Sequence, residues 1–222
     1  MTKKNILVVA AHSDDIEIGM AMKIYDYVQR GYSVYELILS RGELGGDPGI
    51  RTEEAKKAAK IMGVCETWFC EHPNTRFDEV RNDVKNSIEK KVNEIKPSVV
   101  FGHWPYDEHI DHIIAGKELL VAARSVPNLI YYDSLRSQNF VPNYAFYQGQ
   151  KFMDIKLSAT KCHSSQIERN GISLHFILAA GEYWAHKFNH QRCIEGIKND
   201  LKLSSTDKVY AEVFHIHRSS KI

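Results

Sequence analysis

The 222-residue chain has almost no net charge and few cysteines. Lysine and arginine number 29 against 28 aspartates and glutamates, so the formal net charge is +1. This balance gives no electrostatic attraction for nucleic acid. The cysteines contain no C-x-x-C spacing and are Cys65, Cys70, Cys162 and Cys193. We therefore expect four reduced thiols, no disulfide, and a cytoplasmic location.

Long apolar runs are absent as well. No stretch approaches the ~20 apolar residues that a membrane-spanning helix needs, so we expect no membrane partner. Two lysines precede the apolar run Ile6–Ala11, as in a signal peptide, but the run is short and Asp14 and Asp15 follow it. A first β-strand is the better interpretation. There is no linker, repeat or low-complexity stretch, which predicts one domain over residues 1–222.

A glycine-rich phosphate-binding fingerprint is missing after this first strand. In open α/β sheets, ligands bind beyond the carboxyl ends of the strands. Here that position holds the sequence His12-Ser13-Asp14-Asp15. The missing fingerprint argues against a nucleotide-binding oxidoreductase.

Metal-ligand chemistry suits this tetrapeptide. His12 and Asp15 are separated by a strand-to-helix turn, so both can point at one ion. Asp14 projects at a different angle and leaves a spare carboxylate, which can deprotonate a metal-bound water. Alternatively, Asp14 and Asp15 cap the following helix. This segment alone does not decide between the two.

A second polar cluster favours the metal site. The strand-like run Ser98–Gly102 is followed by the stretch from His103 to His112. His109 and His112 are spaced to share a helix face. Catalytic zinc typically takes three protein ligands and keeps one position for water. His12 and Asp15, with either His109 or His112, would complete such a set.

The remaining histidine of that pair, with Asp111 available to orient it, can act as an acid or as an electrostatic stabiliser. Two histidine–carboxylate clusters at equivalent strand ends are hard to explain as helix caps. The sequence therefore predicts a metal site at one edge of a sheet.

Strand and helix patterns alternate along the chain, which predicts an α/β fold with a mostly parallel sheet. Strands are expected at Asn5–Ala10, Ser33–Leu39, Val64–Phe69, Ser98–Phe101, Leu129–Tyr132, Tyr144–Tyr147 and Lys208–His217. Helices are expected at Glu17–Gln29, Arg51–Met62, Asp78–Ile95, His109–Arg124, Asp154–His163 and Leu174–Phe188.

Two motifs resemble those of a known family. The segments Ala11–Glu17 and His109–His112 are similar to the A-H-P-D-D-x-E and H-P-D-H motifs of the PIG-L / LmbE-like zinc-dependent N-acetylglucosamine deacetylases. Ser13 and Ile110 replace the two family prolines, neither of which carries a ligand atom. Weaker similarity extends to Tyr210–Phe214, so the resemblance covers nearly the whole chain.

The resemblance implies a Rossmann-like three-layer sandwich and a set of zinc ligands. One zinc ion per subunit would bind His12, Asp15 and His112. Asp14 would be the general base that activates the zinc-bound water. Iron or cobalt could replace zinc with ligands of this type.

Three further residues receive roles by the same resemblance. His109, oriented by Asp111, would face the tetrahedral intermediate and protonate the leaving amine. Arg51 would bind the substrate. Some family members use a late tyrosine for the oxyanion, but the corresponding stretch here is Leu174–Phe176. No tyrosine aligns there.

The implied activity is hydrolytic removal of an acetyl group from the N-acetylamino group of a sugar, with zinc-bound water as nucleophile. The implied partner is a small N-acetylated sugar or conjugate, and many family members form trimers or hexamers. Alternatives are an amidase acting on a sugar conjugate and an inactive carbohydrate-binding relative. Asp14 argues against the binder, because a binder has no use for a spare carboxylate. Phosphoesterase chemistry would need more bridging carboxylates.

Overall fold

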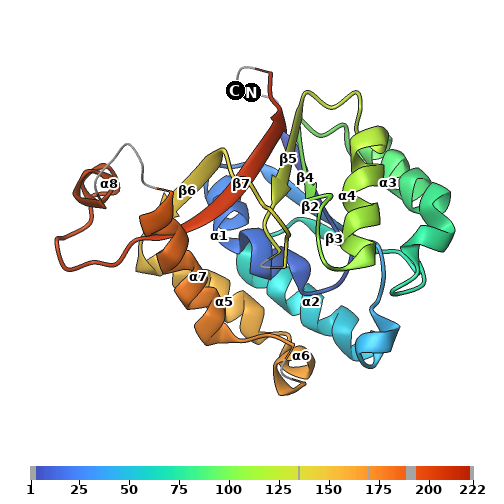
Figure 1. Cartoon of the computed structure of the whole chain (residues 1–222), viewed down its shortest axis with the longest axis horizontal. Coiled ribbons are helices and arrows are strands. Elements are labelled where there is room, and N and C mark those ends of the chain that lie inside the picture. The colour runs from blue at the N-terminus through green and yellow to red at the C-terminus, as the bar shows by residue number, and fades with distance from the viewer. Residues whose placement is uncertain (1–3, 135, 170, 189–193, 221–222) are drawn as a thin grey trace.

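A computed structural model describes residues 4–134, 136–169, 171–188 and 194–220. Its centre is a seven-stranded sheet with the order β3-β2-β1-β4-β5-β7-β6 (Figure 1). The strands are β1 (Asn5–Ala10), β2 (Ser33–Ile38), β3 (Glu66–Phe69), β4 (Val99–His103), β5 (Asn128–Tyr132), β6 (Tyr144–Gln148) and β7 (Tyr210–Arg218). Neighbours among β1 to β5 run parallel, whereas β7 is antiparallel to both β5 and β6. The predicted mostly parallel sheet is confirmed.

Helices cover both faces of the sheet, which completes the three layers (Figure 1). One face carries α1 (Asp15–Gln29), α2 (Pro48–Met62), α5 (Gln150–Lys161) and α7 (Leu174–Lys187). The other face carries α3 (Arg81–Ile95) and α4 (Ile110–Ala122). Shorter elements are η1 (Glu43–Gly45), η2 (Phe77–Val80), α6 (Ser164–Glu168) and α8 (Ile194–Asp200).

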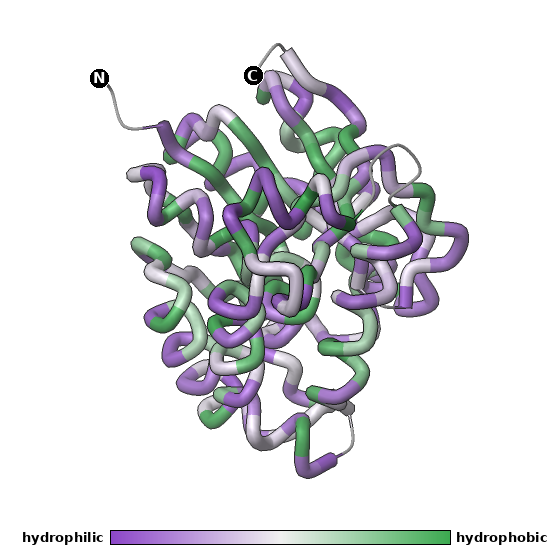
Figure 2. Tube along the Cα trace, turned by 90° about the vertical axis from the view of Figure 1, so that its left-hand side faces the viewer, coloured by the Kyte–Doolittle hydropathy of each residue, from purple (hydrophilic) through white to green (hydrophobic). Residues whose placement is uncertain are grey.

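Two apolar cores lie on opposite faces of the sheet, and β1 contributes to both. Ile6 and Val8 belong to the core under α1 and α2, whereas Leu7 and Val9 belong to the core under α3 and α4. Successive strand residues point to opposite faces, so a strand covered on both sides is a continuous apolar run. Figure 2 shows hydrophobic segments along the interior strands and hydrophilic residues recurring on the outer helices.

The predicted elements all occur, with shifted ends. Helix α2 begins at Pro48, earlier than predicted, because Asp47 accepts a hydrogen bond from the Ile50 N–H and caps it. Helix α5 likewise begins at Gln150. The short helices α6 and α8 were not predicted, because five and seven residues are too few for a clear helical period.

Helix α1 is broken at Met20, a feature without a sequence signal. Met20 has the non-helical angles φ −152° and ψ 24°. Beyond the break, the N–H groups of Met22 and Lys23 donate to the Glu212 carboxylate of β7, at 3.0 and 2.8 Å. Glu212 therefore caps the second half of the helix.

None of the described helices is both long and apolar enough to cross a membrane. The thiols of Cys65, Cys70 and Cys162 are free, as predicted. Cys193 lies outside the described residues.

Candidate active site

The two polar clusters meet at the carboxyl edge of the sheet. Strands β1 and β4 are parallel neighbours, with Val8 opposite Phe101, so both end at the same edge. His12 follows β1, and Asp15 begins α1. His112 lies in the first turn of α4, directly after the loop that follows β4. The predicted convergence of these segments is confirmed.

The side chains of three residues form a compact triangle at this edge, in which His12 and His112 face different oxygens of the Asp15 carboxylate. His112 Nε2 lies 3.3 Å from His12 Nδ1 and 3.2 Å from Asp15 Oδ1. His12 Nδ1 lies 3.6 Å from Asp15 Oδ2. In a tetrahedral zinc site with bonds of 2.0–2.1 Å, neighbouring ligand atoms are about 3.4 Å apart. Two imidazoles and a carboxylate at these separations fit three corners of a metal site.

Two other histidines lie close enough to be considered as ligands. Donor atoms that all lie within 4.8 Å of one another group His12 with His109 and His112, and Asp15 with His103 and His112. The His103 ring stacks on the His112 ring at 3.9 Å, and its Nε2 lies 3.0 Å from Asp15 Oδ2. The Ala11 N–H donates to the same Nε2 at 3.1 Å, and the Tyr132 hydroxyl lies 3.1 Å from it. His103 therefore packs behind Asp15 and His112.

Asp111 holds His12 rather than His109 with its carboxylate. His12 Nε2 lies 3.0 Å from Asp111 Oδ2 and 3.0 Å from Asn74 Oδ1. The same carboxylate accepts hydrogen bonds from the N–H groups of Thr75 and Phe77. The contact with His109 comes from the backbone, since the Asp111 N–H donates to His109 Nδ1 at 3.2 Å. Asp111 therefore contacts His109 through its backbone N–H, whereas its carboxylate is engaged by His12, Thr75 and Phe77.

The imidazoles of His12 and His112 share this acidic support. Burial alone would lower the pKa of His12, but hydrogen bonds to Asp111 and Asp15 raise it to about 9. His112 Nδ1 lies 3.2 Å from Asp107 Oδ1. Burial opposes its charge too, yet Asp15 and Asp107 raise the pKa of His112 to about 10. Without a metal, protons therefore occupy this site at neutral pH.

The pKa values of His103 and His109 are shifted in the opposite direction. Burial, together with the charge of His112, lowers the pKa of His103 to about 4. Burial and the charges of His12 and His112 lower the pKa of His109. His109 accepts a backbone N–H at Nδ1, so its remaining proton is on Nε2. That N–H is the donor that His109 can offer to a bound molecule.

Asp14 does not cap helix α1. It occupies the N-cap position but makes no side-chain capping hydrogen bond. Instead, its Oδ1 accepts a hydrogen bond from Arg51 Nη2 at 3.1 Å. Arg51 Nη1 donates to the Gly42 carbonyl at 2.9 Å, and a Cβ at Gly42 would collide with this guanidinium. The capping alternative for Asp14 is therefore wrong.

A cavity of about 280 Å³ opens over these residues. Its wall includes the metal-site residues and five of the residues discussed above: Asp14, Arg51, Asn74, Thr75 and His109. The sides are closed by Leu44 and Gly45 of the loop after β2 (the flanking loop), Ser134 and Arg136 of the loop after β5, and Gln166 of α6. We call it the catalytic cavity. It brings together all the predicted site residues except Asp111, which lies behind His12.

Sequence reasoning missed Asn74, Asp107 and Arg136. Asp107 could have been noticed, because it lies five positions before His112 in the same polar stretch. Asn74 and Arg136 belong to irregular loops, and no spacing rule connects them to His12 or His112. His103 was part of the noted cluster but received no role.

Comparison with known proteins identifies similar chains. A family model described as PIG-L, GlcNAc-PI de-N-acetylase, matches residues 7–123, more than half of the chain. The "Uncharacterized deacetylase YaiS" of Escherichia coli strain K12 is 29% identical over 170 residues, which cover 73% of this chain and 92% of the relative. The diacetylchitobiose deacetylase of Thermococcus kodakarensis is 27% identical, covering 88% of this chain and 82% of the relative.

Solved structures share the fold. The N,N'-diacetylchitobiose deacetylase of Pyrococcus horikoshii has a TM-score of 0.75 and 20% identity, covering 98% of this chain and 85% of that one. GalB of Pseudomonas putida, a 4-carboxy-2-hydroxymuconate hydratase, has a TM-score of 0.74 and 18% identity, covering 99% and 98%. At sequence identities this low, similarity to these structures supports the fold and not the reaction. One fold thus carries both a deacetylase and a hydratase, so the reaction has to be argued from the site.

Proposed function

The chain belongs to the PIG-L family, and from this premise we propose that it is a metal-dependent hydrolase that removes the acetyl group from an N-acetylated sugar of the N-acetylglucosamine type. The similar proteins of Escherichia coli and Thermococcus kodakarensis are named as deacetylases, which supports this reaction class. The single observation that carries the proposal is a metal-binding triangle with a further carboxylate, Asp14, facing the same cavity.

We propose zinc as the ion, held by His12, Asp15 and His112. The donor set of two imidazoles and one carboxylate supports a catalytic zinc site. When bound, the ion would polarise the acetamide carbonyl and acidify a water molecule. The supporting contacts of Asp111 and Asp107 favour ring orientations that aim His12 Nδ1 and His112 Nε2 at the ion.

Asp14 is the proposed general base. Its Oδ1 is engaged by Arg51, and its side chain lines the catalytic cavity. A fixed carboxylate beside the ion can take a proton from the attacking water. Arg51 also lines the cavity, and two of its nitrogens are engaged by Asp14 and Gly42. We therefore propose that the main role of Arg51 is to position Asp14. The part of its guanidinium that Asp14 and Gly42 do not engage would face the substrate.

His109 is the proposed hydrogen-bond donor to the reacting oxygen, and Asp14 is the proposed source of the proton for the leaving amine. Its Nδ1 accepts the Asp111 N–H, which leaves Nε2–H as the donor. A neutral imidazole can stabilise a developing negative charge through such a hydrogen bond. The proton that Asp14 gains during attack can then reach the amine, which must be protonated to leave.

An amine-release assay tests this function. Metal-replete protein is incubated with a panel of N-acetylated sugars, with and without a chelator, and free amine and acetate are measured. We expect equimolar amine and acetate, and loss of both with chelator. Release of neither product from any sugar, by protein shown to contain metal, would contradict the proposal. Turnover of non-acetyl amides alone would favour the amidase alternative.

A further inference from the structure

One residue of the catalytic cavity has a backbone conformation that its residue type disfavours. Among the residues that the structure describes, four residues other than glycine have a positive φ angle: Thr75, Lys96, Asn139 and Lys202. Thr75, with φ 66°, is the only β-branched one of these four. A branched side chain is strained in this left-handed region. Such strain persists only where the surrounding structure holds the residue in place, and it gathers at functional sites.

The backbone contacts of Thr75 explain why this position is left-handed. Its N–H donates to Asp111 Oδ2 at 2.7 Å, and the same oxygen lies 3.0 Å from His12 Nε2. The preceding Asn74 N–H donates to Glu43 Oε1 at 2.8 Å. These bonds hold the loop between β3 and η2 against the metal site. They use backbone groups of the loop, so they demand a backbone conformation but no particular side chain at position 75.

The threonine side chain is not explained by these contacts. Glycine occupies left-handed positions without strain, and asparagine tolerates them better than most other residues do. Either residue would offer the same N–H to Asp111 with less strain than Thr75. The reason for a threonine must therefore lie in what its side chain contacts.

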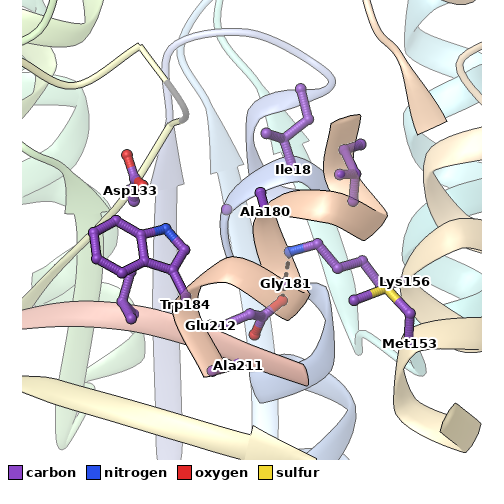
Figure 3. Close-up of a pocket in the computed structure, with 12 residues that line it drawn as sticks. Ile18, Asp133, Met153, Lys156, Ala180, Gly181, Trp184, Ala211 and Glu212 are labelled. Carbon is purple, nitrogen blue, oxygen red and sulfur yellow. Dashed lines mark hydrogen bonds and ion pairs between the residues drawn. The ribbon is translucent and has the colours of Figure 1, made fainter. Parts of the chain in front are cut away.

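Polar side chains that serve the fold have their partners within the protein. Glu212, which caps α1 beyond its break, also accepts a hydrogen bond from Lys156 Nζ at 2.7 Å, and Figure 3 shows these two side chains pointing toward one another. The Thr75 hydroxyl is different, because no group in the described part of the chain forms a hydrogen bond with it. Thr75 is exposed and belongs to the wall of the catalytic cavity. Its hydroxyl is therefore available to a bound molecule.

We propose that Thr75 is a specificity-determining residue, and that its hydroxyl binds the sugar hydroxyl on C3, next to the acetamido group. The inference rests on the proposed function. A single carboxylate oxygen of Asp111 separates the Thr75 N–H from the His12 ring, so Thr75 lies beside the metal site. A sugar whose acetyl group reaches the ion brings the two carbons next to the acetamido carbon closest to this wall. C1 carries the remainder of a conjugate, which leaves the C3 hydroxyl as the partner.

A variant and a matched substrate analogue test this contact together. Thr75→Val keeps the branched shape and removes the hydroxyl. It should lower kcat/KM for N-acetylglucosamine about three- to tenfold, the usual effect of losing one uncharged hydrogen bond. Wild-type protein should lose a similar factor on 3-deoxy-N-acetylglucosamine. On this analogue, Thr75→Val should stay within about twofold of wild type, because both changes remove the same bond.

Three results would overturn the contact. Equal loss on both sugars in Thr75→Val would show that Thr75 acts by shaping the loop. No loss on either sugar would remove Thr75 from the binding site. Coupling to 6-deoxy-N-acetylglucosamine in place of the 3-deoxy analogue would place another part of the sugar at this wall. Thr75→Ser keeps the hydroxyl, so it should stay within about threefold of wild type on N-acetylglucosamine.

Thr75→Gly tests the strain separately from the contact. Glycine relieves the left-handed conformation, so the melting temperature should rise by about 2–4 °C. The N–H that donates to Asp111 remains, so the metal content should not change. The value of kcat/KM for N-acetylglucosamine should nevertheless fall as it does in Thr75→Val.

The matched control is Lys96→Gly. Lys96 is left-handed as well, with φ 51°, but it follows α3 and does not line the catalytic cavity. Its replacement should raise the melting temperature by a similar amount and leave kcat/KM unchanged. A melting temperature that rises in Lys96→Gly but not in Thr75→Gly would overturn the strain from which the inference starts.

A binding measurement separates this inference from the proposed function. Asp14→Asn prevents turnover in the proposed mechanism, so its metal-loaded form can be titrated calorimetrically with N-acetylglucosamine. Adding Thr75→Val should weaken this binding about three- to tenfold. That result supports the contact even if wild-type protein deacetylates no sugar, in which case only the proposed reaction fails. Turnover and binding that Thr75→Val leaves unchanged overturn the contact alone, and absence of sugar binding overturns it as well.

Discussion

At the scale of single residues, Asp14 is the side chain on which the chemistry depends most. Its carboxylate is held by Arg51, and Asp14 is not one of the three residues proposed to bind the metal. Asp14→Asn keeps the volume and removes the base, so kcat should fall roughly 10²–10⁴-fold. The bound metal, measured by elemental analysis, should stay near the wild-type content. Parallel loss of metal and activity would make Asp14 a ligand.

Asp111 gives a second prediction at this scale, now for metal affinity. Its carboxylate is buried and lies 3.0 Å from His12 Nε2. Asp111→Asn removes the charge that orients this imidazole, so metal affinity should fall about 10–100-fold in competition with a chelating dye. Asp78→Asn, an exposed aspartate of η2, is the matched control. Unchanged affinity in Asp111→Asn would show that Asn74 alone holds His12.

The pKa shifts of the ligand imidazoles predict how metal binding depends on pH. The pKa values of His12 and His112, raised to about 9 and about 10, mean that the metal-free site carries protons at pH 7. His12 Nδ1 and His112 Nε2 face each other at 3.3 Å, and at this separation they can share at least one proton. A metal needs neutral imidazoles and must displace that proton.

Affinity should therefore rise at least tenfold per pH unit from pH 6 toward pH 9. Titration calorimetry in buffers of different ionisation enthalpy should show release of at least one proton per ion. Affinity that stays constant between pH 6 and pH 8 would contradict these shifts.

Residues at strand ends could be predicted from the sequence, whereas residues in irregular loops could not. His12, Asp15 and His112 follow apolar runs, and parallel strands end at one edge. Asn74 contacts His12 from a loop 62 positions away. No periodic pattern encodes that contact, because it depends on how η2 and its flanking loop pack against α4.

At the scale of elements, the first two turns of α2 organise one side of the cavity. Arg51 connects Asp14 to the loop at Gly42, and one turn later Glu54 accepts hydrogen bonds from Ser164 and Ser165 of α6. Both side chains lie on one face of the helix. The N-terminal end of α2 thus ties together the base, the flanking loop and α6.

Arg51→Lys tests this organising role. A lysine keeps the charge but cannot reach Gly42 and Asp14 with two fixed nitrogens. If Arg51 chiefly positions Asp14, kcat should fall roughly 10- to 100-fold with KM little changed. Glu53→Gln, at an exposed neighbour on the same helix, is the control. A raised KM with kcat preserved would instead favour the substrate-binding role that the family resemblance implies.

The positions of the strands and helices could be predicted better than the irregularities within them. Continuous apolar runs identified β1 and β4, because both faces of these strands are covered. The break in α1 at Met20 had no such signal. It depends on Glu212, which lies 190 positions from Met22 and supplies the cap only after the sheet has formed.

At the scale of the whole molecule, the three layers bring side chains from distant segments to one sheet edge. The catalytic cavity draws on the loops after β1 and β5, on α2 and α4, and on α6. The reaction is therefore a property of the assembled sheet edge, which explains why a shared fold also serves a hydratase.

The most direct measurement is anomalous diffraction at the zinc absorption edge from crystals of the zinc-loaded protein. We predict a single strong peak between His12 Nδ1, the Asp15 carboxylate and His112 Nε2, with Asp14 outside the coordination sphere. A zinc ion bound by Asp14 or by His103 in place of one of these ligands would contradict the proposed metal centre, as would the absence of a peak at this edge of the sheet. Either result would also contradict the proposed hydrolase activity.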